Sequence, residues 1–152
     1  MLLRKIVTAF LAAVTIVPAA GAVTITTIDV PGAITTAPQG INSRGDMVGP
    51  FSGADGVSHG FLLSHGTFTT IDVPGVPQTF GCFGINALGD IVGSTIDSSG
   101  NDHGFLLSGG RYTTIDFPGA VATDLNDINP SGDIVGQYAD SDGNEHGFIL
   151  SK

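Results

Sequence analysis

Three histidines recur once in every repeat of this chain and are its first candidates for chemistry. His59, His103 and His146 each precede a Gly-Phe pair. Three imidazoles around one ion, with a fourth position open, would make a zinc site, but each ring nitrogen must then lie within about 2.1 Å of the metal. Because repeated units hold equivalent positions apart, we favour a structural role in which each ring ties down a neighbouring loop. The sequence therefore predicts no metal site and no catalytic residue.

Two acidic loops have part of the ligand pattern of a calcium site. They run from Asp97 to Asp102 and from Asp140 to Glu145, each with glycine at its fourth position. An EF-hand loop needs its glycine at position six and a glutamate at position twelve, and neither loop has them. Hairpin turns explain both loops better, so no cofactor is expected, with calcium kept as an open alternative.

The places where the repeats differ are the remaining candidates. Matching positions before an Ile-Asn pair hold Pro38-Gln39-Gly40, Cys82-Phe83-Gly84 and Leu125-Asn126-Asp127. If this run is the innermost strand of a propeller blade, its side chains face the central surface where ligands bind. The only acidic cluster there is Asp124, Asn126 and Asp127, for which an Asx-rich surface turn is the favoured explanation. Ligand-binding residues are therefore left unassigned.

Other polar and thiol groups point to structural roles. Cys82 is the only cysteine, so the chain has no internal disulfide, and a buried, inert thiol is expected unless it bridges to a second chain. Six aspartates recur at matching positions of the units, and this recurrence favours a role in backbone hydrogen bonding within turns. They are Asp29, Asp46, Asp72, Asp90, Asp116 and Asp133.

These candidates are positioned by a repeat that covers nearly the whole chain. HGFLLSHGTFTTIDVPG begins at His59, HGFLLSGGRYTTIDFPG at His103 and HGFILSK at His146, while TITTIDVPG opens at Thr24. A second block, INxxGD, begins at Ile41, Ile85 and Ile128. A period of 40 to 50 residues is typical of repeat proteins, in which each unit buries its apolar face against its neighbours.

Each unit predicts about four antiparallel strands. Residues 111–117 alternate in polarity as a half-buried strand does, and Pro118-Gly119 ends them. GFLLS and DIVG are short apolar runs that suit buried strands, and a weaker run leads from Thr79 to Asn86. No helical periodicity occurs. We expect an all-β fold of three four-stranded, propeller-like units, with a pseudo-threefold β-trefoil as the alternative.

The combination of INxxGDIVG, a polar Gly-Asn loop and HGFLL resembles the bacterial extracellular repeats of the HAF family. The family is named after a His-Ala-Phe motif, where this chain has glycine at positions 60, 104 and 147. The resemblance covers nearly all of the mature chain. It implies a secreted, propeller-like β-repeat and transfers no catalytic residues.

The first 22 residues resemble a secretory leader. A short basic start is followed by an apolar stretch, and Ala20 and Ala22 form an A-x-A cleavage site. The stretch is shorter than the roughly 20 apolar residues of a membrane anchor. Cleavage would leave residues 23–152 as one domain, either extracellular or periplasmic, with no membrane attachment.

The charge of the chain and the absence of several catalytic motifs limit the classes of function that are expected. The chain has 14 acidic residues, and loss of the leader removes Arg4 and Lys5 from its 5 basic ones, which disfavours nucleic acid and anionic membranes as partners. No phosphate loop, serine elbow or zincin motif occurs. We expect a binding or structural module for polysaccharide or a surface protein, with an extracellular lyase or hydrolase as the alternative.

The ends of the chain raise a question of closure. Three units are few for a propeller of four to eight blades, so a homodimeric six-unit ring or an open half-ring is an alternative to a closed trefoil. The third unit stops after its HGF strand, and the spare copy at Thr24 to Val30 matches the strand that it lacks. We expect this copy to pair beside Gly147 to Ser151, within one chain or across a two-chain ring.

Overall fold

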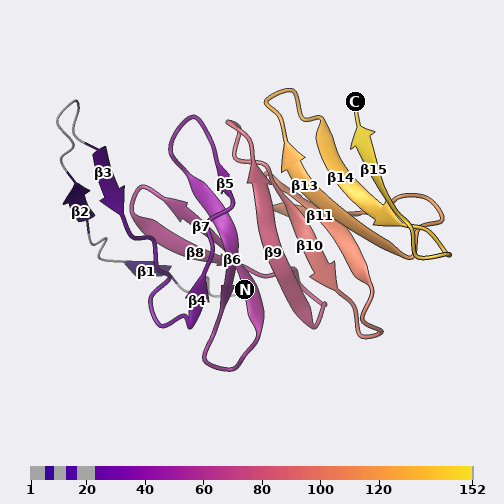
Figure 1. The fold of residues 1–152 in the computed structure, drawn as a ribbon, viewed down its shortest axis with the longest axis horizontal. Coiled ribbons are helices and arrows are strands. Elements are labelled where there is room, and N and C mark those ends of the chain that lie inside the picture. The colour runs from indigo at the N-terminus through magenta and orange to yellow at the C-terminus, as the bar shows by residue number, and fades with distance from the viewer. Residues whose placement is uncertain (1–5, 9–12, 17–22, 152) are drawn as a thin grey trace.

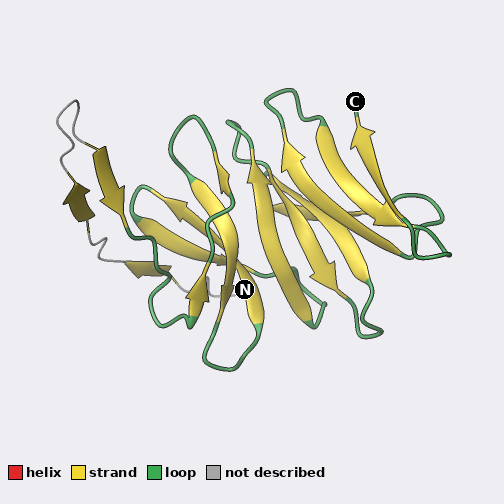
Figure 2. Ribbon diagram, in the orientation of Figure 1, coloured by secondary structure: helices red, strands yellow, loops and turns green. Residues whose placement is uncertain are grey.

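The protein consists of antiparallel β-sheets throughout the residues that the structure describes. The computed structural model describes residues 6–8, 13–16 and 23–151, and these contain strands and no helix (Figure 2). The all-β class predicted from the sequence is therefore confirmed.

Three sheets correspond to the three repeat units and stand in a row along the molecule (Figure 1). The first has the order β1 (Ile6–Thr8), β8 (Thr67–Ile71), β7 (Ser58–Ser64), β6 (Met47–Ser52), β4 (Thr35–Thr36), with β5 (Gly40–Ile41) also paired to β6. The second is β12 (Arg111–Ile115), β11 (Asp102–Ser108), β10 (Ile91–Ile96), β9 (Gln78–Ile85). The third is β13 (Ala122–Ile128), β14 (Ile134–Ala139), β15 (Glu145–Leu150). A separate pair contains β2 (Ala13–Ile16) and β3 (Val23–Thr26).

The INxxGD motif forms the turn between the first two strands of each unit. In the second unit the Asn86 N–H donates to the Asp90 carbonyl at 3.0 Å, and the Gly89 N–H donates to the Asn86 carbonyl at 3.1 Å. Gly89 has a φ of 88°, in the left-handed region that glycine adopts without a steric penalty. The motif therefore sets the register between β9 and β10.

Two apolar layers hold the sheets face to face. The layer between the first and second sheets contains Val48, Ile71, Cys82, Ile85, Ile91, Phe105 and Leu107. The layer between the second and third contains Val92, Leu125, Ile128 and Ile134. Consecutive residues of one strand, such as Ile91 and Val92, point to opposite layers because side chains alternate along a strand. This is why the DIVG and GFLLS runs are apolar throughout.

The prediction that the N-terminal copy closes the third unit of its own chain is wrong. β3 pairs with β2 and lies at the opposite end of the molecule from β15 (Figure 1). The following residues Ile28 and Val30 pack on the outer face of the first sheet, over Phe61, Leu63 and Phe68. The first sheet follows these residues directly in the sequence, so only a short loop is needed to reach its face. Pairing with β15 would instead close a loop that contains most of the chain, which costs more conformational entropy.

The sheets remain open, so the structure does not have the closed threefold arrangement of a trefoil. The predicted leader, residues 1–22, lies mostly outside the described residues. Its described parts are β1, which pairs with β8, and β2, which pairs with β3. Cleavage after Ala22 and export stay predictions.

Candidate functional site

A hollow of about 330 Å³ lies where the innermost strands of the three units meet, and each unit contributes to its wall. The lining residues are Gln39 from the first unit, Phe80 and Phe83 from the second, and Asp124, Asn126 and Gln137 from the third. The hollow therefore combines two aromatic rings with amide and carboxylate groups.

Bulges in the innermost strands direct the key side chains into this hollow. Along β9, Val92 pairs with Gly84 and Gly93 with Cys82, so Phe83 has no partner in the ladder. The same happens at Phe80, because Ser94 pairs with Gly81 and Thr95 with Thr79. In β13 the unpaired residue is Asn126, between Leu125 and Asp127. A bulge bends the strand and redirects a side chain, and bulges are frequent beside functional sites.

The sequence predicted part of this arrangement. Gln39, Phe83 and Asn126 occupy the matching positions at which the repeats differ, and all three line the hollow. The interpretation of this run as an innermost strand that faces a ligand surface is consistent with the fold, since β9 and β13 are edge strands of their sheets.

Phe80 was not among the residues predicted to face a ligand, although the spacing of the repeats indicates an additional residue at its position. Thr36 and Thr123 each precede the isoleucine of the INxxGD motif by five positions, whereas Thr79 precedes Ile85 by six. The second unit therefore has one additional residue in its innermost strand. The second bulge of β9 accommodates it and presents Phe80, whose exposed fraction is 47%.

The rings of Phe80 and Phe83 contact each other edge to face, with centroids 6.3 Å apart and planes at 71°. Gln137 Nε2 donates to Asp124 Oδ2 at 3.4 Å. Nearby, burial and the negative charge of Asp124 raise the pKa of Asp102. The lining of the hollow therefore contains both aromatic rings and hydrogen-bonding groups.

The acidic cluster of the third unit is divided by the fold. Asp124 and Asn126 line the hollow, whereas Asp127 Oδ1 accepts a hydrogen bond at 2.8 Å from the backbone N–H of Ile128. All three residues of the cluster lie within strand β13 (Ala122–Ile128), so the Asx-rich surface turn that was favoured for them is wrong.

Each repeat histidine pairs with an aspartate of its own sheet. His59 Nδ1 lies 2.8 Å from Asp72 Oδ1, and His103 Nδ1 lies 3.0 Å from Asp116 Oδ2. Hydrogen bonding to Asp116 raises the pKa of His103. In the part of the chain that the structure describes, no three His, Cys, Asp or Glu side chains are grouped to hold a metal ion. The tying role expected for these rings is therefore what the structure shows.

A smaller hollow of about 180 Å³ lies beside His59 and Asp72. Ser58 also lines it, but neighbouring residues of a strand project to opposite faces. Ser58 is therefore not aligned on the His59 ring as a nucleophile would be, and we do not assign a site there.

The two calcium-like loops are hairpin turns. Asp97 Oδ1 accepts backbone N–H groups from Ser99 and Asn101 at 2.8 and 2.9 Å, and Asp140 Oδ1 accepts those of Asp142 and Asn144 at 2.9 Å. Backbone hydrogen bonding to Asn101 is the largest effect that lowers the pKa of Asp97 to about 2. These carboxylate oxygens are engaged by the turn itself.

Cys82 is a free thiol with no exposed surface. Burial, with a smaller effect from the charge of Asp72, raises its pKa. The predicted burial is confirmed, and a thiol that resists ionisation is a poor nucleophile.

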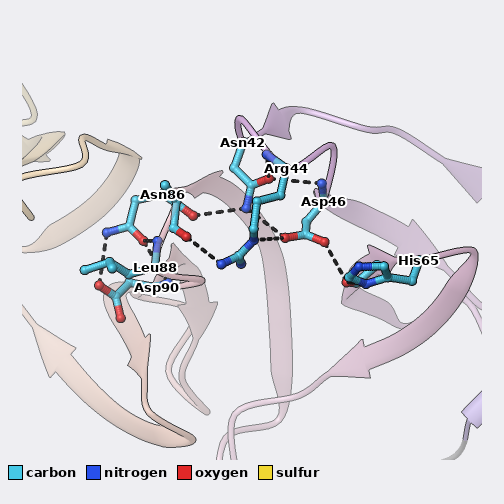
Figure 3. Close-up of polar contacts among 9 residues, drawn as sticks. Asn42, Arg44, Asp46, His65, Asn86, Leu88 and Asp90 are labelled. Carbon is cyan, nitrogen blue, oxygen red and sulfur yellow. Dashed lines mark hydrogen bonds and ion pairs between the residues drawn. The ribbon is translucent and has the colours of Figure 1, made fainter.

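Polar contacts join the INxxGD turns of successive units (Figure 3). Asn42 Nδ2 donates to the Asn86 carbonyl at 3.1 Å, and Asn86 Nδ2 donates to the Asn129 carbonyl at 3.4 Å. In the first unit Arg44 adds a bond at 2.6 Å to the Ala87 carbonyl. The turns therefore form a ladder, in which the asparagines of the first and second units each donate a hydrogen bond to the turn of the following unit.

Asp46 is the most strongly bound carboxylate of this ladder, and it gives a pH-dependent prediction. Ser64 Oγ donates to it at 2.6 Å and Arg44 Nε at 2.9 Å, and hydrogen bonding to Ser64 is the largest effect that lowers its pKa from 3.8 to about 2. A lowered pKa stabilises the folded state fully above about pH 4, and this stabilisation is lost as the pH falls toward 2. We expect Asp46→Asn to lower the free energy of unfolding by about 2 kcal/mol at pH 7, and by much less at pH 2.5.

Urea unfolding at the two pH values measures this difference. Asp133→Asn is the matched control, because among side chains only Asn129 donates to Asp133 in the described structure. An Asp46→Asn effect that is equal at both pH values would contradict the prediction.

The fold and the hollow together define a class: an all-β protein of stacked antiparallel repeat sheets with an aromatic and polar site at their innermost strands. Comparisons of the chain with protein-family models, with curated proteins and with solved structures give no significant match. In the described residues no helix has the length and apolar character needed to span a membrane.

Proposed function

We propose that this chain is a secreted, propeller-like binding module whose hollow binds an extracellular polysaccharide. The stacking of the three antiparallel sheets, with residues of all three units lining one hollow, supports the propeller-like part of the proposal. The leader-like N-terminus and the resemblance to HAF repeats support export.

The observation that carries the proposal is the presentation of Phe80 and Phe83 by consecutive bulges, in a hollow that amide and carboxylate groups also line. A sugar ring has an apolar C–H face that packs on an aromatic ring, and hydroxyl groups at its edge that both donate and accept hydrogen bonds. Asn126 and Gln137 offer a donor and an acceptor in each amide, and Asp124 is an acceptor. The lining of the hollow therefore contains groups that suit both kinds of surface that a sugar presents.

Binding to a glycan array, followed by calorimetry on the best ligand, tests this proposal. We expect Phe80→Ala to weaken binding at least tenfold, since the ring supplies apolar contact area that alanine does not, and Asn126→Ala to weaken it by a similar factor. Leu88→Ala is the matched control, because Leu88 is an apolar side chain with an exposed fraction of 76% outside the hollow. Binding unchanged by Phe80→Ala, or no glycan bound, would contradict the proposal.

The alternative function is a lyase or hydrolase that acts on the same class of polymer. One observation favours it: Asp102, with its raised pKa, is electrostatically coupled to Asp124 in the wall of the hollow. A carboxyl group with a raised pKa near a second carboxylate is an arrangement that glycoside-cleaving enzymes use as acid and base. Chromatography of the array ligands after incubation separates the two functions. Product formation that is abolished by Asp124→Asn would replace the binding module by an enzyme.

A further inference from the structure

One face of the third sheet has the features of a unit interface, but no unit among the described residues packs on it. This open face contains Val135, Gly147 and Ile149. The matching residues of the second sheet, Val92, Gly104 and Leu106, pack against or next to the third unit. Val92 has no exposed surface, whereas Val135 and Ile149 have exposed fractions of 45% and 65%.

The glycine in each interface receives a side chain from the following unit. A Cβ atom added at Gly60 would collide with Cys82 Sγ, and one added at Gly104 would lie 2.7 Å from Leu125 Cγ. At Gly147 the nearest atom would be the Gly136 carbonyl oxygen, 3.9 Å away. The same recess therefore exists on the open face, and no side chain fills it among the described residues. Pro38 occupies the position of the first unit that matches Cys82 and Leu125.

The asparagine ladder ends at the same place. Asn86 is buried and donates both within its own turn and to Asn129, whereas Asn129 is exposed and its side chain donates to Asp133 within the described structure. Asn129 occupies the position from which Asn42 and Asn86 donate a hydrogen bond to the turn of the following unit.

The opposite end of the molecule has the complementary features. Residues 24–30 match the fourth strand of a unit, and Ile28 and Val30 pack on the first sheet as Ile71 and Val73 pack on the second. The attachment is also the same: the Val30 N–H donates to Thr36 Oγ1 at 3.0 Å, and the Val73 N–H donates to Thr79 Oγ1 at 2.9 Å. These residues therefore have the sequence and the packing of the fourth strand of a preceding sheet, and the strand that pairs with β3 in the described structure is β2.

A histidine and an aspartate supply the matching charges. In the first two units the Nδ1 atom of the histidine binds the aspartate of the fourth strand, as His59 does with Asp72. His146 binds Asp140 through Nε2, and in the described part of the chain its Nδ1 atom makes no hydrogen bond. Asp29 is the matching aspartate on residues 24–30, and it is exposed.

We propose that two copies of this chain associate head to tail, so that residues 24–30 of one copy form the fourth strand beside β15 of the other. The first sheet of the incoming copy then covers the open face, places Pro38 over Gly147 and brings Asp29 to His146. The argument is continuity with the interfaces that already join the three sheets. β2, which pairs with β3, lies within the predicted leader, so cleavage after Ala22 would free β3 for this pairing.

The contact joins two different surfaces, so it either closes into a ring of copies or continues as a filament. It also covers β15, an edge strand that would otherwise present unpaired backbone groups. It is independent of glycan binding, since none of the residues that carry it line the hollow.

Sedimentation of the full chain, purified as its host processes it, tests the association. We expect dimers or larger arrays at micromolar concentration, and monomers after Ile149→Glu, which places a charge on the open face. Leu88→Glu is the matched control and leaves the assembly intact. A chain that stays monomeric at 100 μM, with or without other proteins bound to it, would overturn the proposal.

A mixing experiment distinguishes head-to-tail contact from pairing of two open faces. Asp29→Arg disrupts the head and Ile149→Glu disrupts the tail, so each variant alone associates at least tenfold more weakly, and an equimolar mixture regains a one-to-one dimer. His146→Glu combined with Asp29→Arg restores association by reversing the charge pair. If Asp29→Arg leaves assembly unchanged while Ile149→Glu abolishes it, the open faces pair with each other and the head-to-tail contact is wrong.

Discussion

Replacing Gly104 with alanine is expected to lower the free energy of unfolding by about 3 kcal/mol. The added methyl group would lie 2.6 Å from the Ile115 carbonyl oxygen and 2.7 Å from Leu125 Cγ. The first of these is a backbone atom of the neighbouring strand, and Leu125 is completely buried. Relief of these contacts requires β12 to shift against β11 within the second sheet, or Leu125 to move out of the layer between the second and third sheets, and overpacking of a core costs about 1–3 kcal/mol or occasionally more.

Chemical denaturation measures this effect, with Gly147→Ala as its matched control. Gly147 occupies the same position of the third unit, where an added Cβ has only the Gly136 carbonyl oxygen near it, at 3.9 Å. We expect a change of less than about 0.5 kcal/mol there, as for most surface substitutions. The comparison is made in the Ile149→Glu background so that association does not contribute. Equal effects at both glycines would show that the sheets are not stacked as described.

The second large effect is expected for Asn86→Ala, at about 3 kcal/mol. Asn86 is 2% exposed, and its side chain donates to Asp90 and to the Asn129 carbonyl while its oxygen accepts the N–H groups of Leu88 and Asp90. Alanine removes all four of these hydrogen bonds at a buried position, and a hydrogen bond contributes about 0.5–1.5 kcal/mol net, or more when one partner is charged. Thermal unfolding and urea titration both measure the loss.

Asn129→Ala is the control for this prediction, because Asn129 has the same place in its turn but is exposed. Water can replace the lost partners there, so we expect a loss of about 1 kcal/mol. An Asn86→Ala protein that unfolds at the same urea concentration as Asn129→Ala would contradict the role of the ladder.

The strands could be predicted because their local patterns agree with their packing. DIVG and GFLLS lie between two apolar layers, so their uniform apolar character follows from burial on both faces, and the Gly and Asn positions of INxxGD follow from the turn. The weak run from Thr79 to Asn86 corresponds to β9. Its irregular pattern comes from two bulges, which break the alternation that identifies a strand.

The candidate site was only partly predictable. The matching positions of Gln39, Phe83 and Asn126 could be found because they interrupt the repeat. Phe80 could not be assigned, because a bulge is defined by how two strands pair. The sequence of β9 alone does not determine which of its residues pair with β10. The aspartate partners of His59 and His103 depend in the same way on the register between neighbouring strands.

The N-terminal copy was placed wrongly for a different reason. Its sequence matches a fourth strand, and the third unit lacks one, so the pattern alone favours closure. The pattern does not contain the connection, however: Ile28 and Val30 are only a few residues from β4, and the first sheet presents Phe61 and Phe68 on the face nearest to them. Covering that face is the contact with the lower entropic cost of loop closure.

The additional residue of β9 shows that this scaffold can change the lining of its hollow without changing its framework. At each bulge the register between β9 and β10 shifts by one residue and the ladder then continues, while the asparagine contacts between sheets lie in the turns. An insertion or deletion at the innermost strand is therefore absorbed where it occurs. Libraries that vary only the side chains of Phe80, Phe83, Asp124 and Asn126, and keep the buried Cys82 and Leu125, would change the lining of the hollow on one unaltered fold, which makes the chain a candidate starting point for engineered affinity reagents.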